Sequence, residues 1–382
     1  MTTTFLQSAI NNPYQLYDTM LSENPIYWDE TNKLWAIYSF EGCKAILNSD
    51  LAHIPTVDKN GLNEHALLII EHLARLNNGV RHEIAKHSAK VIFDKMKIVN
   101  IKERLENALN TEGGIMGLDW VNSISKKLPI MIVLHSFDFK KDDFTYISSQ
   151  IEQLVKIMLP HKTPEQVLAI NKISKKVYEI TEKHILQTSI FSHVIIELSE
   201  KYHIETDKTL SYLVSNLIGL FIQSYDAGRG VLSNSFLQVQ NNRNSQLLSD
   251  KTYLEKSVIE TLRFDPPIHN TRRIADADIE FNNFTFKKGQ SIFIMLAAAN
   301  RDPNKFEKPQ IYNIERINNN ENLTFGSGGH LCLAKHFSIH LTVEILFHFF
   351  QQYPKTKILN KKIEYEPSIN ARLPKQILVS LK

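Results

Sequence analysis

The segment best suited to chemistry is a glycine-rich loop that leads through a cysteine into an amphipathic helix, Phe325-Gly-Ser-Gly-Gly-His330-Leu-Cys332-Leu-Ala-Lys335. A thiolate at a helix N-terminus faces backbone N–H groups and the positive end of the helix dipole, which lower its pKa and favour metal ligation. The glycines allow the backbone to approach a flat, bulky cofactor without Cβ clashes. His330 is placed to donate to a carboxylate of such a cofactor. A buried structural cysteine in an ordinary loop is the alternative, because free cysteine is among the most buried residue types.

The composition excludes several other classes of protein. Cys43 and Cys332 form no C-x-x-C spacing, so neither a disulfide framework nor a structural zinc site is expected. The 44 basic and 41 acidic residues leave a net charge of +3, which argues against nucleic acid or a membrane surface as a partner. Residues 1–12 lack the basic and apolar regions of a signal peptide, and no run of 18 apolar residues follows. A cytoplasmic protein is therefore expected.

Periodicity predicts a mainly α protein with a minor β portion and one continuous core, read as a single domain over residues 1–382. The strongest element is a helix from about Asp207 to Leu237, opened by Thr206 as N-cap and on the order of 45 Å long. It is apolar on nearly all sides around residues 213–222, so it should cross the interior. Further expected elements are a helix led by Pro13, a hairpin around residues 29–33, helices over 64–109 with a break at 77–79, mostly helix over 140–236, strands at 279–286, 291–295 and 376–380, and a helix after Cys332.

The cysteine loop resembles the haem-binding loop of the cytochrome P450 superfamily, whose pattern is F-G-x-G-x-H-x-C-x-G. It matches at Phe325, Gly326, Gly328, His330 and Cys332, and it departs at the last position, where Ala334 replaces glycine. The resemblance implies the cytochrome P450 fold, with the long central helix over the haem. It also implies haem b as the cofactor, with Cys332 as the ligand of its iron.

Other segments match the same family in the expected order. Glu260-Thr-Leu-Arg263 fits the E-x-x-R helix, where the spacing places carboxylate and guanidinium on one face, and Arg316 stands where the family completes the ion triad. Pro266-Pro267 followed by Arg273 resembles the stretch whose arginine pairs with a haem propionate. Residues 300–303, Asn-Arg-Asp-Pro, resemble the family's turn after a strand.

A second propionate partner is implied upstream. Asn78-Gly79-x-x-His82-x-x-x-Lys86 resembles the family's N-G-x-x-H-x-x-x-R segment, with Lys86 in place of the usual arginine. A solvated charged helix face is the alternative for His82 and Lys86.

The central helix departs from the family where an acid and an alcohol usually relay protons to dioxygen. The family pattern A-G-x-D/E-T aligns with residues 223–227, so the acid is kept as Asp226 and the threonine is replaced by Ala227. Three readings follow: a substrate hydroxyl or ordered water replaces the alcohol, the oxidant is peroxide, or the reaction is a coupling or ring closure. Gly228 and Gly230 weaken the helix locally and favour a kink or bulge.

The function that the resemblance implies is a bacterial-type haem-thiolate monooxygenase that oxidises a small organic molecule in specialised-metabolite biosynthesis. Haem-dependent oxidative coupling or cyclisation, a peroxygenase, and a non-catalytic interaction partner are the alternatives. Electrons are expected from a separate ferredoxin or flavodoxin with its reductase, and Lys335 and His336 are candidates for the docking face.

Overall fold

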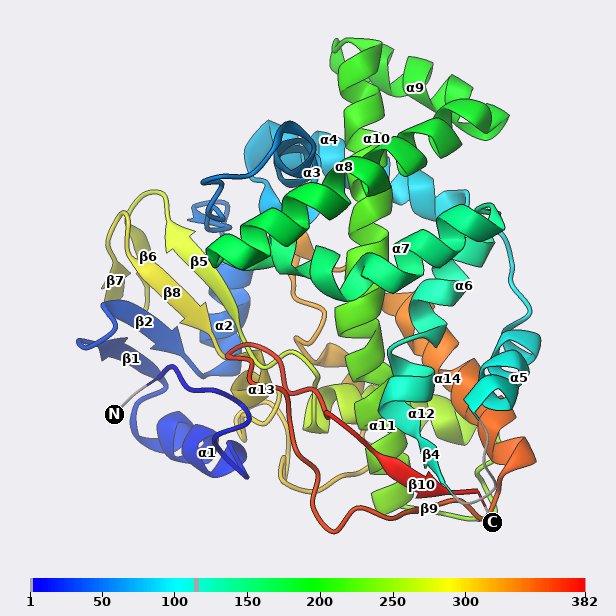
Figure 1. Ribbon diagram of the computed structural model, residues 1–382. Helices are drawn as coiled ribbons and strands as arrows, with labels where there is room; N and C mark the ends of the chain where they lie inside the picture. The colour runs from blue at the N-terminus through cyan, green and yellow to red at the C-terminus, as the bar shows by residue number, and fades with distance from the viewer. Residues whose placement is uncertain (1–2, 113–116, 382) are drawn as a thin grey trace. The chain divides into compact units, whose positions relative to one another are not determined.

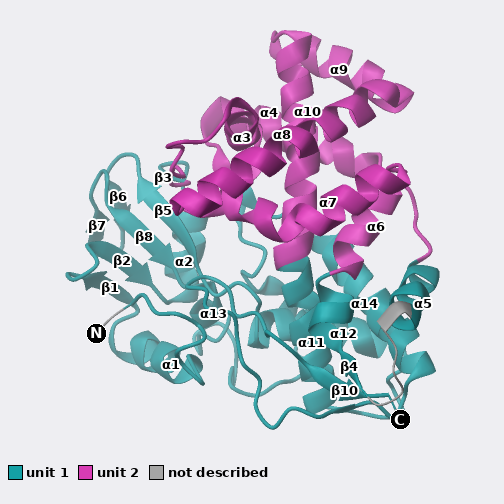
Figure 2. Cartoon of the chain, in the orientation of Figure 1, with its two compact units in different colours: residues 1–53, 101–126, 227–382 teal, residues 54–100, 127–226 magenta. Residues whose placement is uncertain are grey.

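Helices dominate the chain and the strands form small sheets, as the sequence predicts (Figure 1). The computed structural model describes residues 3–112 and 117–381. Two compact units divide the chain (Figure 2): unit 1 comprises residues 1–53, 101–126 and 227–382, and unit 2 comprises residues 54–100 and 127–226.

Unit 1 contains a five-stranded sheet in the order β1-β2-β8-β5-β3. The predicted hairpin is present, since β1 and β2 pair antiparallel. On its other side, β2 pairs parallel with β8. The strands are β1 (Ile26–Asp29), β2 (Leu34–Ile37), β8 (Ser291–Ile294), β5 (Thr271–Ala275) and β3 (Ala52–His53). Strand β5 was not predicted, and it places Arg273 opposite Ile292 of β8.

Two smaller sheets complete the strands of unit 1. The run predicted at residues 279–286 is a hairpin, β6 (Ile279–Phe281) and β7 (Phe284–Phe286), and its turn uses the left-handed conformation of Asn282, φ +52°. Asparagine tolerates that conformation better than most residues, which explains why the alternation breaks there. The second small sheet has the strand order β4-β10-β9 and consists of β4 (Leu118–Asp119), β10 (Leu378–Ser380) and β9 (Lys357–Ile358).

The helices of unit 1 bury an aromatic core. Trp120 stacks on Phe236 with ring centroids 4.2 Å apart, and Phe349 meets Trp120 edge-on at 4.7 Å. Helix α14, which follows Cys332 as predicted, packs against α12 and α5. These helices are α1 (Tyr14–Glu23), α2 (Phe40–Leu47), α5 (Ile101–Glu112), α11 (Arg229–Asn241), α12 (Lys251–Phe264), α13 (Leu296–Ala299) and α14 (Lys335–Gln352).

Unit 2 is helical, and α10 (Thr206–Gln223) runs through its interior. Helix α10 is buried without interruption from Tyr212 to Ile222, and it packs against α3, α4 and α8. A Cβ on Gly219 would collide with the side chain of Leu73, so glycine is what lets the chain after α3 approach α10. The other helices of unit 2 are α3 (Glu64–His72), α4 (Gly79–Asp94), α6 (Leu128–Ser136), α7 (Lys141–Leu154), α8 (Pro164–Gln187) and α9 (Ser189–Tyr202).

The predicted single helix over residues 207–237 is interrupted. A π-helical segment, η4 (Ser224–Gly228), separates α10 from α11, and Glu205 rather than Thr206 occupies the N-cap of α10. The bulge lies where the glycines predicted one. Close packing also requires glycine at position 230, because an added Cβ would lie 2.5 Å from Pro267 Cβ and 2.6 Å from Leu373 Cδ2.

Two other helix boundaries differ from prediction. The break at residues 77–79 is confirmed, but a second break separates α4 from α5, which begins at Ile101. Pro13 stands at the N-cap of α1 rather than inside its first turn. Across residues 3–112 and 117–381, no helix is both long and apolar enough to cross a bilayer.

Candidate functional site

The cysteine loop closes on itself through backbone hydrogen bonds. Cys332 N–H donates to Phe325 O at 3.0 Å, and Leu331 N–H donates to Gly328 O at 3.1 Å across the short 3₁₀ turn η6 (Gly328–His330). Gly326 and Gly328 adopt φ values of +75° and +66°, a region that disfavours residues with a Cβ. The loop is therefore a defined turn that brings Phe325 beside the backbone of Cys332.

Helix α2 provides the seat on which this loop rests. A Cβ on Gly328 would lie 2.7 Å from Leu47 O and 3.0 Å from Asn48 Cα. The Ser327 hydroxyl donates to Asn48 Oδ1 at 3.0 Å. Glycine at position 328 is thus required by contact with the end of α2, a reason that the sequence did not reveal. At Gly329, by contrast, an added Cβ would meet no protein atom within 4 Å.

The two cysteines occupy different environments. Cys332 is half-buried and lies two residues before Ala334, the N-cap of α14, so it leads into that helix as the sequence predicted. Cys43 is fully buried in the core, where its thiol donates to Ile37 O at 3.2 Å and burial raises its pKa. Only Cys332 is accessible to a ligand.

Arg273 provides a buried positive charge in unit 1. Its side chain is 4% exposed, and Nη1 donates to Thr271 Oγ1 at 3.3 Å and to the carbonyl of Arg272 at 2.9 Å. A charge at this depth is costly unless anions or strong acceptors surround it. His330 is half-buried on the cysteine loop.

The remaining predicted site residues lie on helices. His82 and Lys86 are half-buried and one turn apart on α4 of unit 2, and His82 Nδ1 is hydrogen-bonded to Ala74 O at 2.9 Å. Asp226 and Ala227 are half-buried in η4. Asp226 is the last residue of unit 2, and Ala227 begins the third segment of unit 1. Phe325, His330, Cys332, Arg273 and Ala227 therefore share unit 1, whereas His82, Lys86 and Asp226 belong to unit 2.

Side chains just before Asp226 bond to their own helix. Gln223 Nε2 donates to Gly219 O at 3.1 Å, and the Ser224 hydroxyl donates to Phe221 O at 2.8 Å. Such back-bonding by serine accompanies bends in helices, and π-bulges occur frequently at functional sites. Neither side chain takes the place of the missing threonine hydroxyl in this arrangement.

The predicted ion triad is present and buried. Glu260 and Arg263 are both 0% exposed and form two hydrogen bonds, of 2.6 Å and 3.0 Å. Arg316 Nε lies 3.6 Å from Glu260 Oε1, as the family pattern implied.

Asn300 links this triad to the cysteine loop. Its carbonyl accepts from Arg263 Nη1 at 3.1 Å, while its side chain accepts from Leu323 N at 2.7 Å and donates to Thr324 Oγ1 at 2.8 Å. Leu323 and Thr324 immediately precede Phe325. The sequence marked residues 300–303 as a turn but did not show that Asn300 holds the start of the loop.

These residues fit a haem. A half-buried thiol, a buried guanidinium and an imidazole match the iron and propionates of that group, and Gly329 faces space that the protein leaves open. In the part of the chain that the structure describes, no three His, Cys, Asp or Glu side chains gather to hold a metal ion by themselves.

Known proteins match the chain along nearly its whole length. The family model for cytochrome P450 matches residues 234–376. The biotin biosynthesis cytochrome P450 of Bacillus subtilis (strain 168) is 22% identical, over 98% of this chain and 97% of its own. Pulcherriminic acid synthase from the same organism is 23% identical, over 86% and 85% of the two chains. The structure of P450BioI in complex with hexadec-9Z-enoic acid ligated acyl carrier protein superposes with a TM-score of 0.81 at 20% identity, over 96% of this chain and 98% of that one.

The residues matched by the family model, 234–376, include the cysteine loop and the ion triad described above. The chain is therefore similar, along nearly its whole length, to the haem-containing monooxygenases of the cytochrome P450 superfamily, and it shares their fold.

Proposed function

We propose that this chain is a cytochrome P450 monooxygenase that oxidises a small organic molecule in specialised-metabolite biosynthesis, with the Cys332 thiolate as the ligand of the haem iron. The observation that carries the proposal is the loop geometry: an accessible thiol held by the Cys332 N–H to Phe325 O bond, beside open space at Gly329. When bound, haem with a thiolate ligand supplies oxidative chemistry that favours O–O cleavage.

The charged residues are proposed to hold the two propionates. Arg273 and His330 would pair with one, and His82 with Lys86 would pair with the other, while Phe325 would pack beside the cofactor. The bond between His82 Nδ1 and Ala74 O fixes the orientation of that imidazole. Charge-assisted bonds of this kind each contribute roughly 1.5 to 3 kcal/mol, so several residues share the retention of haem.

At the oxygen site, Asp226 is proposed as the acid of the proton relay, and Ala227 leaves that relay without an alcohol. Because Gln223 and Ser224 bond to their own helix, we infer that a substrate hydroxyl or an ordered water completes the relay. Two relatives are named for the synthesis of biotin and of pulcherriminic acid, which supports a biosynthetic role for this chain as well.

Oxidative coupling, cyclisation or peroxygenation is the second candidate, and the alanine at position 227 favours it. The test compares the rate of product formation with hydrogen peroxide alone against the rate with NAD(P)H and an electron-transfer partner, because a peroxygenase is expected to be faster with peroxide.

The partner is proposed to be a ferredoxin or flavodoxin with its reductase. Lys335 and His336 begin α14, three and four residues beyond Cys332, and the flanking Leu331 and Leu333 are 45% and 38% exposed. We further propose a cytoplasmic location, and that units 1 and 2 together form one cytochrome P450 domain.

The reduced carbon monoxide difference spectrum tests the ligand assignment. Cys332→Ala is expected to abolish the band typical of thiolate ligation, and Cys43→Ala, the matched control, is expected to retain it because Cys43 is a core residue. A thiolate band of wild-type size in Cys332→Ala would reject the assignment. Wild-type protein that shows no band would favour the non-catalytic alternative.

A further inference from the structure

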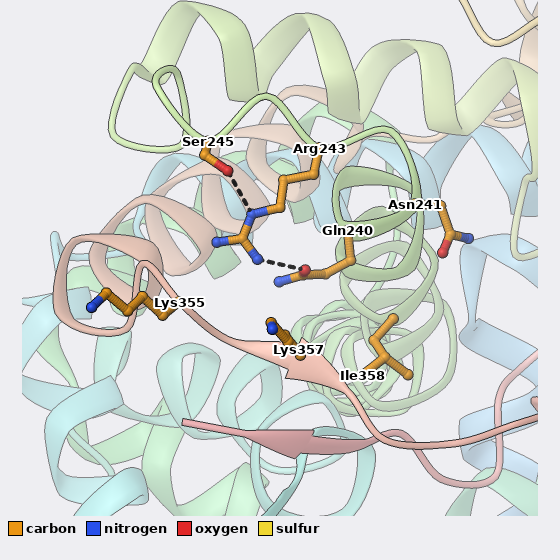
Figure 3. Close-up of a pocket in the computed structure, with 7 residues that line it drawn as sticks. All are labelled: Gln240, Asn241, Arg243, Ser245, Lys355, Lys357 and Ile358. Carbon is orange, nitrogen blue, oxygen red and sulfur yellow. Dashed lines mark hydrogen bonds between the residues drawn. The ribbon is translucent and has the colours of Figure 1, made fainter. Parts of the chain in front are cut away.

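A pocket of about 630 Å³ lies in unit 1 where α11 ends, outside the residues assigned to haem (Figure 3). Its wall is formed by Gln240 in the last turn of α11, Arg243 and Ser245 in the loop that follows, and Lys355, Lys357 and Ile358 at and before β9. Pockets of this size are typical of small-molecule ligands.

Arg243 is fixed in this wall by neutral groups. Its Nε donates to Ser245 Oγ at 3.1 Å, and its Nη1 donates to Gln240 Oε1 at 3.2 Å and to Thr356 O at 2.6 Å (Figure 3 shows the two side-chain bonds). Its Nη2 donates to Pro354 O. These acceptors orient the guanidinium but do not neutralise its charge.

Two lysines add to the positive charge. Lys355 and Lys357 are exposed and line the same pocket, and no acidic residue lines it. Among residues 3–112 and 117–381, neither lysine nor Arg243 forms an ion pair with a carboxylate. Three cations that share a concave wall without a counter-charge repel one another and attract an anion.

Gln240 contributes an unsatisfied donor. Its Oε1 is taken by Arg243, and its Nε2 is buried without an acceptor in the described chain. A buried N–H group without an acceptor costs free energy, which an acceptor supplied by a ligand would recover. The wall therefore offers both a hydrogen-bond donor and positive charge to a ligand.

We propose that this pocket binds a small molecule that carries an oligophosphate chain. Phosphate oxygens accept hydrogen bonds from several donors at once and pair well with guanidinium and ammonium groups. A chain of linked phosphates places several negative charges along a wall that holds three cations. This binding site is independent of the haem chemistry proposed above.

The test is calorimetric titration of the haem-loaded protein with sodium tripolyphosphate. Saturable binding of one tripolyphosphate per chain is expected. Replacement of both pocket lysines, Lys355→Gln with Lys357→Gln, is expected to weaken binding at least tenfold. The matched control, Lys361→Gln with Lys362→Gln, removes the same charge from exposed positions outside the pocket wall and is expected to change affinity less than threefold.

Two outcomes would overturn the proposal: no saturable binding at millimolar tripolyphosphate, or equal weakening in the two double variants, which would indicate a diffuse field. Titration with adenosine triphosphate identifies the source of the phosphates. Equal affinity means that the phosphate chain alone is recognised, and tighter binding means that a nucleoside contributes contacts. The carbon monoxide band, which both double variants should retain, verifies that they are folded.

Discussion

The adjacent glycines of the cysteine loop provide a test at the scale of single residues. Gly328→Ala places a Cβ 2.7 Å from Leu47 O at a φ of +66°, so it is expected to destabilise the protein by about 1–3 kcal/mol and to lower haem content. Gly329→Ala meets no protein atom within 4 Å, so its effect on unfolding is expected to stay within about 0.5 kcal/mol. Urea unfolding and the ratio of haem to protein absorbance measure both effects, and equal losses in the two variants would argue against the seat on α2.

Glu260 provides a second test, since its charge is buried between Arg263 and Arg316. Glu260→Gln leaves two arginines without their carboxylate and is expected to cost about 3–5 kcal/mol. Glu315→Gln breaks the exposed ion pair between Glu315, which lies in a turn, and Lys256 of α12, and it is expected to cost less than about 1 kcal/mol. The denaturant concentrations at the unfolding midpoints of the two variants measure these losses of stability. Equal midpoints would contradict the expected contribution of the buried triad.

Among single residues, those in short local motifs were predictable from sequence. The cysteine loop and the E-x-x-R pair depend on spacings of a few residues, and the structure confirms the turn and the triad. The roles of Asn48 and Asn300 were not predictable, because each acts on residues far away in the chain. Hydrogen bonds of that range leave no periodicity in the sequence. Whether Arg273, His330, His82 and Lys86 contact haem stays a prediction.

At the scale of elements, the π-helical segment η4 carries the departure from the family at Ala227. If a substrate hydroxyl or ordered water relays the proton, Ala227→Thr is expected to leave product formed per NAD(P)H unchanged or lower, because the added atoms crowd the site. Restoration of a missing relay would instead raise that yield by a readily measured factor, since such groups contribute about 10²- to 10⁴-fold. A large gain would reject the inference.

Ala227→Val is the matched control for this experiment, because valine has the shape of threonine without its hydroxyl. A loss of yield shared by both variants reports crowding. Peroxide released per NAD(P)H consumed, measured alongside product with the native substrate, separates uncoupled turnover from slow chemistry.

The sequence predicted the type of most helices and strands, but it predicted their first and last residues less well. The bulge near Gly228 followed from helix propensity, and the hairpin of β1 and β2 followed from alternation. The hairpin of β6 and β7 was read as one strand, because its two-residue turn interrupts the alternation only briefly. Strand β5 was missed because its buried Arg273 breaks the apolar pattern, and tertiary pairing with β8 overrides that signal.

At the scale of the whole molecule, His269 is expected to make stability depend on pH. It is fully buried, its Nδ1 lies 3.0 Å from Tyr17 Oη, and burial, together with the charges of Arg372 and Arg301, holds its pKa well below the ordinary 6.5. Below pH 6.5 the unfolded chain gains a proton at His269 that the folded chain does not bind. As the pH decreases below about 6.5, the free energy of unfolding should therefore decrease, by up to about 1.4 kcal/mol per pH unit.

His269→Gln keeps a hydrogen-bonding partner for Tyr17 and removes the titration, so it is expected to flatten this dependence between about pH 5 and pH 7. The exposed His340→Gln is the control and should leave the dependence as in the wild type. Urea unfolding across that range gives the slopes, and a slope that persists in His269→Gln would assign the effect to other groups.

The seat of the cysteine loop also bears on the order in which the molecule is made. Asn48 and Ser327, joined by a hydrogen bond, are 279 residues apart, so a ribosome delivers the seat on the order of 15 to 55 s before the loop. The cysteine loop, which packs on the end of α2, is therefore synthesised only near the end of translation. If Cys332 is the haem ligand as proposed, its binding turn forms only late in synthesis, and we expect haem binding to be one of the last events in the maturation of the chain.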